Sequence, residues 1–427
     1  MNFLTDINAQ WVLAGCVLLG ICSGILSSFA MLRKRSLLGD ALAHSALPGV
    51  CIAYLIVGER SIPAFMLGAL AAGMLGAFCI QFITRNSRIK EDAALGLVLS
   101  VFFAVGIVLL TYILNSSGGN KAGLKTFIFG QAASMVGRDV YIMASCAIIV
   151  IVFSLLLYKE MKLLCFDVGF ADSLGYSSTW LDAMLNILIV LIVVIGLQAV
   201  GVVLMVAMLI TPAAAARYWT NRLNRMTLIS ALFGGLSGAL GVYLSALAPR
   251  MPTGPWIVLS ATLMFILSLL FAPARGLVAK GLRIWSLRSR VARENALRSL
   301  YEWSERKKGW DDWAPLEEIA SMRSQPPVQA LRNLRGLKSN QLVEEKNGAF
   351  RLTKSGQDQA YQVTRNHRLW EMYLMYEEEF DADHVDRDAD FIEHFLTPET
   401  VNELERLLDS HGLNLKQPPT AHPIATA

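Results

Sequence analysis

The chain has 427 residues, 54% of them apolar, and a formal net charge of +4. Residues 1–280 carry 18 Lys and Arg against 10 Asp and Glu, whereas residues 281–427 carry 20 against 24. Mean hydropathy is +0.46, and almost all apolar excess lies before residue 273, in runs longer than the roughly 18 residues that span a bilayer. This composition excludes a wholly soluble protein and predicts a membrane domain followed by a soluble one. The six cysteines have no paired spacing, which argues against a disulfide framework or a zinc knuckle.

Nine apolar stretches predict an all-α polytopic membrane domain over residues 1–278, with about nine transmembrane helices. They lie near residues 11–32, 38–57, 62–84, 93–114, 139–158, 181–199, 201–218, 227–247 and 256–272. With the N-terminus outside, alternate connections place 13 Lys and Arg on the inner side and five on the outer side, as expected of cytoplasmic loops. The first stretch ends in Arg33-Lys34-Arg35 and does not follow positive charge, so we expect it to remain as a helix. An odd number of crossings then puts the C-terminal domain in the cytoplasm.

Asp40 and His44 are four residues apart in the second stretch, so one helical turn places a carboxylate and an imidazole on one face. Ionisable side chains at this depth cost free energy and usually mark a pathway. Pro48 has no N–H to bond the His44 carbonyl, which leaves a backbone oxygen beside the pair. Oxygen and imidazole ligands suit Mn²⁺, Fe²⁺ or Zn²⁺ without selecting among them; the alternative is a structural pair satisfied by polar neighbours. A metal site would need ligands from a second copy, so it implies a dimer.

A short inner loop carries apolar residues at helical spacing, Phe166, Phe170 and Leu174, with Asp167 beside them. Such a knob would fit a cleft on another protein, and the alternative is a short interfacial helix on lipid. The sequence contains no Gly-x-x-x-x-Gly-Lys-Ser/Thr phosphate loop. We therefore expect a transport subunit without enzymatic activity, with ATP hydrolysis on a separate subunit.

Three segments, Arg35 to Gly49, Glu91 to Gly96 and Gln198 to Ala213, resemble the permease subunits of manganese, zinc and iron ABC importers. The resemblance covers residues 10–278 and implies a bacterial cytoplasmic membrane protein. It implies as partners two ABC ATP-binding subunits, an extracytoplasmic metal-binding protein and a second permease copy or paralogue. It also places Asp40 and His44 on the metal path, and makes residues 166–175 similar to the helix that presses on the ATPase.

A basic connector over residues 279–292 leads to a cytoplasmic α+β domain over residues 293–355. The pattern predicts helices over 316–322 and 328–339, with Val328, Leu331 and Leu334 inward, and then two strands joined by Asn347-Gly348. This order is typical of a winged helix-turn-helix. Residues 323–354 hold seven Lys and Arg against two acids, and the candidate DNA contacts are Gln329, Arg332, Asn333, Lys346 and Arg351. The alternative is a winged helix used only for protein contacts.

Residues 293–410 resemble the iron- and manganese-dependent repressors of the diphtheria toxin repressor type, through Leu352 to Gly356, Asn366 to Glu371 and Asp390 to Val401. The resemblance implies a helical metal-binding and dimerisation segment over 356–410, before a tail at 411–427. Its regulatory Mn²⁺ or Fe²⁺ would be bound by His367, Glu371, Asp390, Glu393 and His394. Asn295 and Arg298 stand where the manganese type has acidic ligands, and an arginine there would repel a cation. The sequence leaves metal sensing open.

The sequence as a whole predicts the membrane permease of an ABC importer that moves divalent transition metals into the cytoplasm, manganese first and then iron or zinc. No intrinsic cofactor is expected beyond the transported ion and a regulatory metal in the C-terminal domain. The alternative function is a membrane-tethered, metal-responsive transcription regulator that binds DNA. A third reading is local feedback, in which metal bound to the C-terminal domain slows transport.

Overall fold

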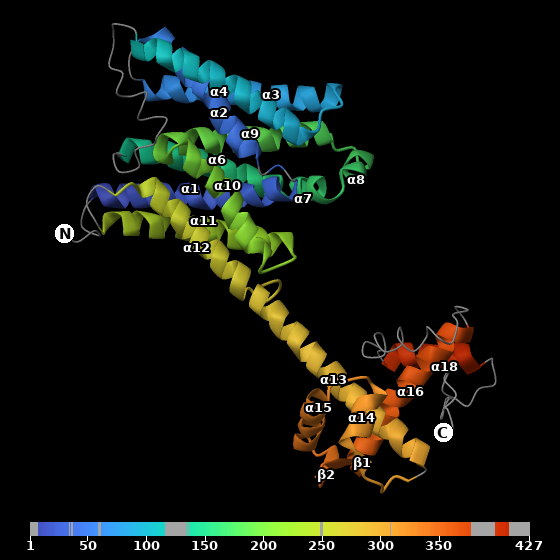
Figure 1. Ribbon diagram of the computed structural model, residues 1–427. Helices are drawn as coiled ribbons and strands as arrows, with labels where there is room; N and C mark the ends of the chain where they lie inside the picture. Colours follow the sequence, from blue (N-terminus) through green and yellow to red (C-terminus); the bar gives the residue numbers. More distant parts are fainter. Residues whose placement is uncertain are drawn as a thin grey trace. The chain divides into compact units, whose positions relative to one another are not determined.

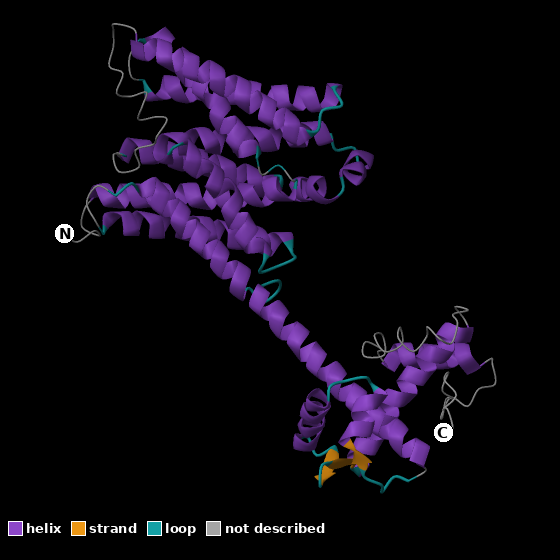
Figure 2. Cartoon of the chain, in the orientation of Figure 1, coloured by secondary structure: helices purple, strands orange, loops and turns teal. Residues whose placement is uncertain are grey.

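The computed structural model describes residues 7–33, 35, 37–58, 61–115, 135, 137–247, 251–307, 309–376 and 398–409. The chain divides into two compact units, residues 1–280 and 281–427. The first unit is a bundle of helices, and the second combines helices with a small sheet (Figures 1 and 2).

The long helices of the first unit follow the apolar stretches of the sequence. They are α1 (Ile7–Leu32), α2 (Leu38–Val57), α3 (Ile62–Asn86), α4 (Glu91–Asn115), α6 (Gly137–Leu156), α9 (Ser178–Val200), α10 (Val202–Arg217), α11 (Leu223–Ala246) and α12 (Thr253–Phe271). Two short helices, α7 (Tyr158–Phe166) and α8 (Val168–Ser173), lie between α6 and α9. Among the described residues, eight helices are long and apolar enough to cross a membrane.

The remaining apolar stretch forms helix α10, which is shorter than the eight candidate spanning helices. Its 16 residues rise about 24 Å, less than the roughly 30 Å of a hydrocarbon core. Gly201 separates it from α9 with a φ of 84°, a left-handed value that favours glycine. A Cβ on Gly196 would lie 1.9 Å from the Met205 sulfur, so the two helices are folded back against each other at this corner. The described residues therefore give eight candidate membrane spans rather than about nine, and the remaining apolar stretch forms the shorter helix α10.

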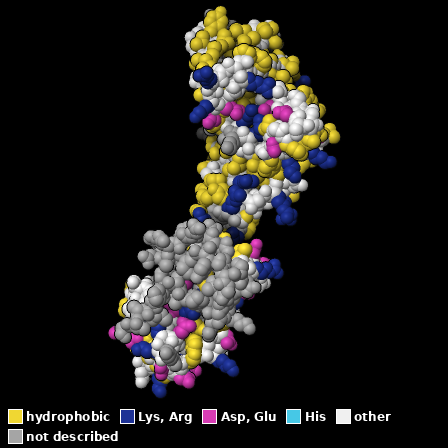
Figure 3. All heavy atoms as spheres, turned by 90° about the vertical axis from the view of Figure 1, so that its right-hand side faces the viewer, with side chains coloured by type: hydrophobic (Ala, Val, Ile, Leu, Met, Phe, Trp, Pro, Cys, Tyr) yellow, Lys and Arg dark blue, Asp and Glu magenta, His cyan; other side chains and the backbone are white. Residues whose placement is uncertain are grey.

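Five connections lie at one end of the bundle, where hydrogen bonds join them or the helix ends beside them. Tyr158 donates to Asn224 Oδ1 at 2.7 Å, and the Arg275 amide donates to the Tyr218 oxygen at 3.2 Å. The described residues of these connections are 33, 35, 37, 87–90, 157–177, 218–222 and 272–276, and they carry eight of the 13 Lys and Arg that the charge rule assigned to the inner side. Four more, Arg85, Arg217, Arg225 and Lys280, lie in the adjoining helices. We call this the basic end. Figure 3, which faces the right-hand side of Figure 1, shows the Lys and Arg side chains over it with Asp and Glu between them.

Helices α1, α2 and α9 form the inside of the first unit. In an 18-residue apolar stretch of α2, 67% of the residues are buried, against 22% in the corresponding stretch of α4. Glycines let backbones touch: a Cβ on Gly20 would lie 2.2 Å from the Gly234 oxygen, and one on Gly49 would lie 2.0 Å from the Gly68 oxygen. Such close approach supplies the association energy that lipid does not. It fixes α2 against α3 directly beside Pro48.

The second unit is built around α13 (Leu277–Lys307), α14 (Leu316–Met322), α15 (Pro327–Ser339) and α16 (Lys354–Tyr376). Its three-stranded antiparallel sheet has the order β1 (Ala314–Pro315), β3 (Ala349–Leu352), β2 (Val343–Lys346), with Ala314 opposite Phe350 and Val343 opposite Leu352. Helix α18 (Pro398–Asp409) packs on α16. Leu297, Leu334, Phe350 and Ala360 belong to one buried core.

The two short helices and the hairpin lie where the sequence predicted them. Asn347 and Gly348 have φ values of 51° and 77°, as the two-residue turn requires. Two details differ. Strand β1 was not expected, and Val328 is 76% exposed rather than inward. The buried residues of α15 are Ala330, Leu334 and Leu337, and Val328 lies on the opposite side of that helix. The connector at 279–292 lies within α13.

Candidate functional site

Asp40 and His44 lie on α2 in the inner part of the first unit. His44 Nε2 is 3.3 Å from Asp40 Oδ1, and the two side chains are 25% and 32% exposed, respectively. Ligand distances of about 2.0–2.2 Å put neighbouring ligands of one ion roughly 3 Å apart, so the pair is spaced to share an ion. The remaining exposure leaves one side of the pair open.

Two neighbouring helices hold the pair in place. The His44 ring meets Phe103 of α4 edge to face, with ring centroids 4.8 Å apart. One residue before Asp40, a Cβ on Gly39 would lie 2.5 Å from a methyl of Leu209 on α10. Pro48 lies inside α2, as expected from the sequence. The site is thus positioned by the buried helix α2 and by contacts from α4 and α10.

The described residues of one copy offer too few ligands for a metal ion at this pair. Among the residues that the structure describes, no group of three or more His, Cys, Asp and Glu side chains is placed to hold one. A four-coordinate ion bound by Asp40 and His44 would need two more ligands. The partly exposed pair fits a shared site better than a closed one.

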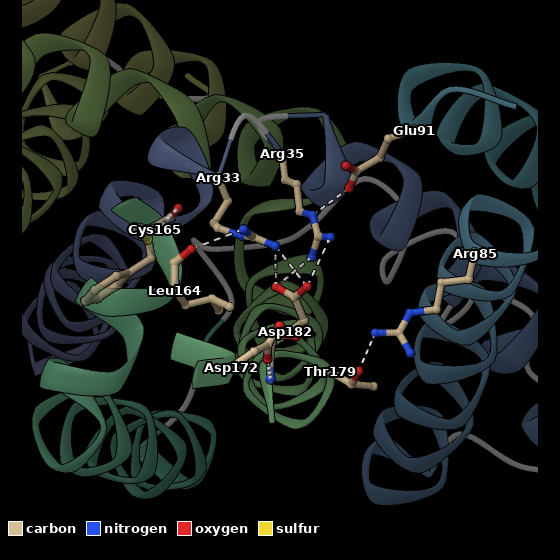
Figure 4. Close-up of polar contacts among 11 residues, drawn as sticks. Arg33, Arg35, Arg85, Glu91, Leu164, Cys165, Asp172, Thr179 and Asp182 are labelled. Carbon is tan, nitrogen blue, oxygen red and sulfur yellow. Dashed lines mark hydrogen bonds and ion pairs between the residues drawn. The ribbon is translucent and has the colours of Figure 1, made fainter. Parts of the chain in front are cut away.

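A cluster of ion pairs occupies the basic end (Figure 4). Arg33 Nη2 donates to both oxygens of Asp182, at 2.8 and 2.9 Å, and Arg33 Nη1 donates to the Leu164 carbonyl at 3.1 Å. Arg35 Nη1 lies 3.2 Å from Asp182 Oδ1, and Arg35 Nε lies 2.5 Å from Glu91. Asp182 is 8% exposed, so its charge is compensated by two arginines inside the protein.

This cluster ties the start of α2 to three other helices. Arg33 and Arg35 precede α2, Leu164 lies near the end of α7, Asp182 lies in α9 and Glu91 begins α4. The Cys165 thiol lies beside the cluster (Figure 4), and burial raises its pKa to about 12, so it is protonated at neutral pH. Sequence reasoning used Arg33 and Arg35 for topology, and Arg35 also within the permease-like segment, but it did not pair either with Asp182. A signal was present: Asp182 is the single acid between residues 178 and 217, and a lone charge in an apolar helix requires a partner.

The predicted docking residues lie on α7, α8 and the turn after them. Phe166, Phe170 and Leu174 are 61%, 52% and 55% exposed, but they do not lie on one helix, because the chain is extended at Asp167 between α7 and α8. Asp167 instead caps α8, because its Oδ1 accepts from the Phe170 amide at 2.9 Å. Asp172 of α8 accepts from the amide of Ser178, the first residue of α9, at 3.1 Å. The knob is therefore joined to the helix that carries Asp182.

Two of the five predicted C-terminal ligands are within the described residues. His367 and Glu371 of α16 are 1% and 2% exposed, and His367 Nε2 lies 3.0 Å from Glu371 Oε1. His367 Nδ1 lies 2.7 Å from Nη1 of Arg298, a residue of α13 that is 6% exposed. Asp390, Glu393 and His394 lie outside the described residues, so the structure does not test whether the five come together.

The predicted DNA contacts divide into exposed and engaged side chains. Gln329 and Arg332 of α15 and Lys346 of β2 are exposed, whereas Asn333 is half-buried. Arg351 is occupied: its Nη2 donates to Glu344 at 2.7 Å, and its guanidinium lies 4.8 Å from the ring centre of Trp313. The two acids of β2 thus offset part of the positive charge, because Lys338 also pairs with Glu345 at 2.8 Å.

Comparisons with known proteins match both units. Residues 6–272 match the ABC 3 transport family, and residues 353–426 match the metal binding and dimerisation domain of iron dependent repressors. A manganese transport system membrane protein of Bacillus subtilis is 46% identical over 407 residues, which cover 95% of this chain and 92% of the relative. A zinc transport system membrane protein of Treponema pallidum is 43% identical over 278 residues, 65% of this chain and 93% of the relative. The solved PsaBC of Streptococcus pneumoniae, in complex with Fab, has a TM-score of 0.57 and 32% identity over 66% of this chain and 96% of that one.

The chain therefore belongs to the ABC 3 transport family. It is a multi-pass membrane permease, a transport subunit rather than an enzyme, and it carries a C-terminal segment of the iron-dependent repressor family. The recognition of both parts from sequence motifs is confirmed.

Proposed function

We propose that this permease imports divalent transition metal ions, manganese first and iron or zinc next, through a passage between two permease copies. The observation that carries the proposal is the pair Asp40 and His44, spaced 3.3 Å apart on a buried helix and still open on one side. A second copy, or a paralogue, would bring the matching pair and complete four ligands. The names of the Bacillus and Treponema relatives support manganese and zinc as cargo.

We assign the basic end to the cytoplasm and the N-terminus to the outside. The excess of Lys and Arg on this end supports the assignment. Since α13 begins at the same end as α12 finishes, the C-terminal domain would also be cytoplasmic. An extracytoplasmic metal-binding protein would then deliver ions at the opposite end of the bundle. Labelling of single cysteines placed at exposed loop positions of each end, with a reagent that does not cross membranes, tests this orientation.

The ATP-binding subunits would dock on Phe166, Phe170 and Leu174. Three exposed apolar side chains support a docking role: Phe170 on the capped helix α8, Phe166 at the end of α7, and Leu174 directly after α8. The cluster at Asp182 offers a route from these residues to the start of α2. Movement of α8 would reach α9 through Asp172 and Ser178, and would reach Arg33 and Arg35 through Asp182. Closure of the ATPases would thereby move α2, the helix that holds Asp40 and His44.

Phe170→Asp should abolish docking of the ATP-binding subunits. Placing a charge at the centre of an apolar contact should cost at least about 2 kcal/mol, roughly a 30-fold loss of affinity. The measurement is co-purification of the ATPase with tagged permease. Val328→Asp, at another exposed apolar position in the second unit, is the matched control and should not change the yield. Undiminished co-purification of the Phe170 variant would remove the knob from the interface.

For the second unit, we propose a winged helix over residues 293–355 and a dimerisation segment over residues 356–410. The order α14, α15, hairpin supports the winged helix, and exposed Gln329 and Arg332 on α15 support DNA binding as a second function. A membrane-tethered regulator of transcription would bind DNA through the same exposed residues of α15. Arg351 and Lys338, both paired with glutamates, would contribute little.

Arg332→Ala should weaken sequence-specific DNA binding by the full-length protein in detergent by about 1–3 kcal/mol, because a base contact would be lost. The measurement is a titration of labelled promoter DNA over a range of salt. Lys354→Ala, at the start of α16, is the control for a change of charge alone. Equal binding to all DNA, with affinity that falls steeply in salt, would leave only electrostatic association.

A further inference from the structure

A buried arginine occupies the position between α13 and α16 where the repressor-like segment would bind its metal. Arg298 Nη1 lies 2.7 Å from His367 Nδ1, and Arg298 Nε donates to Glu302 at 2.7 Å. On its other side, His367 Nε2 lies 3.0 Å from Glu371 Oε1. Arg298, His367 and Glu371 are 6%, 1% and 2% exposed, so this row of three side chains is protein interior.

The protons in this row can be assigned from the chemistry of the groups. A guanidinium only donates hydrogen bonds and stays charged in proteins, so His367 Nδ1 must be the acceptor. A neutral imidazole has one lone pair and one N–H. Its N–H must therefore be on Nε2, where it donates to the Glu371 carboxylate. Both ring nitrogens are then in use.

This proton arrangement does not fit a metal on His367. A ligating histidine gives the metal the lone pair of one nitrogen and donates the N–H of the other to an acceptor. Here the group beside Nδ1 is a donor, so a metal on Nε2 would leave Nδ1 facing Arg298 with an N–H against an N–H. The second oxygen of Glu371 has no hydrogen-bond partner among the described residues, which would suit a cation. That single oxygen does not make His367 available as a metal ligand. The Arg298 guanidinium still lies beside the His367 ring.

We propose that Arg298 is the resident cation of this segment: its guanidinium joins α13 to α16 in place of a metal, so that the segment is held together without Mn²⁺ or Fe²⁺. A second pair, Arg368 of α16 with Glu305 of α13 at 2.5 Å, ties the same two helices. The C-terminal domain would then not report metal through His367 and Glu371. Its function would be constant with respect to intracellular metal.

The test uses the full-length protein carrying Asp40→Ala and His44→Ala, so that the proposed transport site does not contribute. Melting of the C-terminal domain, followed through the fluorescence of a tryptophan kept there, is measured in EDTA and in MnCl₂, and bound manganese is determined after dialysis. With Arg298 intact, we expect the same melting temperature in both solutions and less than stoichiometric manganese. A manganese-dependent rise in melting temperature, with one ion per chain, would overturn the proposal.

Two variants of Arg298 make the test sharper. Arg298→Gln removes the cation and offers no acid, so it should lower the melting temperature in EDTA and in manganese alike. Arg298→Glu supplies a carboxylate and frees the His367 lone pair, so it should melt early in EDTA and recover in manganese. Arg335→Gln, an exposed arginine of α15, is the matched control and should melt as the parent does. Melting of Arg298→Gln at the parent temperature would also overturn the proposal. None of these readouts depends on transport, so a failed transport assay would leave them interpretable.

Discussion

Asp40→Asn should lower manganese uptake by at least about 100-fold in vesicles that contain the permease, its ATP-binding subunits and the metal-binding protein. Even partners of a ligand change metal affinity by roughly 10- to 100-fold, and this change removes the charge of a ligand itself. His44→Ala should have a similar effect. Both positions are 25–32% exposed on α2, so neither change leaves a fully buried charge behind, and assembly should be retained.

The control for this prediction is Asp92→Asn, an exposed carboxylate near the start of α4. It removes one negative charge from the same unit without touching the pair. Uptake should then remain near that of the parent protein. If Asp40→Asn transports at the parent rate, the path of the ion must be sought elsewhere in the bundle.

Asp182→Asn should uncouple ATP hydrolysis from transport. The change leaves Arg33 and Arg35 without the carboxylate that both contact, and removal of one member of a buried ion pair costs about 3–5 kcal/mol. We expect a lower melting temperature of the membrane domain and more ATP hydrolysed for each ion imported. A variant that merely unfolds would lose both activities together, so the ratio of the two rates identifies coupling.

Asp182→Glu provides the conservative comparison, since it keeps the charge on a side chain one methylene longer. It should recover most of the stability and part of the coupling ratio. An Asp182→Asn protein with a normal ratio of ATP to imported metal would mean that the signal from α8 reaches α2 by another route.

The sequence predicted the helices and the hairpin better than it predicted the contacts between distant residues. Apolar stretches located every described spanning helix, because hydropathy follows directly from the need to satisfy backbone groups in lipid. The hairpin at Asn347-Gly348 was found for a similar local reason, since few residues adopt a positive φ. The short strand β1 was missed, because it pairs with β3 across more than 30 residues and has only two residues of its own.

The candidate sites were predictable only where the partners are near in sequence. Asp40 and His44 share one helical turn, so their spacing could be read directly. The cluster around Asp182 joins residues up to 149 positions apart, and a single sequence does not contain that pairing. Arg298 was expected to conflict with a metal, but only the structure places its guanidinium 2.7 Å from His367 Nδ1.

The continuous helix through residues 279–292 has a consequence for release of the C-terminal domain. Proteases bind their substrates as extended chains, and local unwinding is the cost of presenting one. Within α13, Arg290 and Glu294 add an ion pair one turn apart at 2.7 Å, which favours the wound form. A free, diffusible fragment would therefore arise only after this linker melts, and the two units of the chain are expected to stay on one polypeptide.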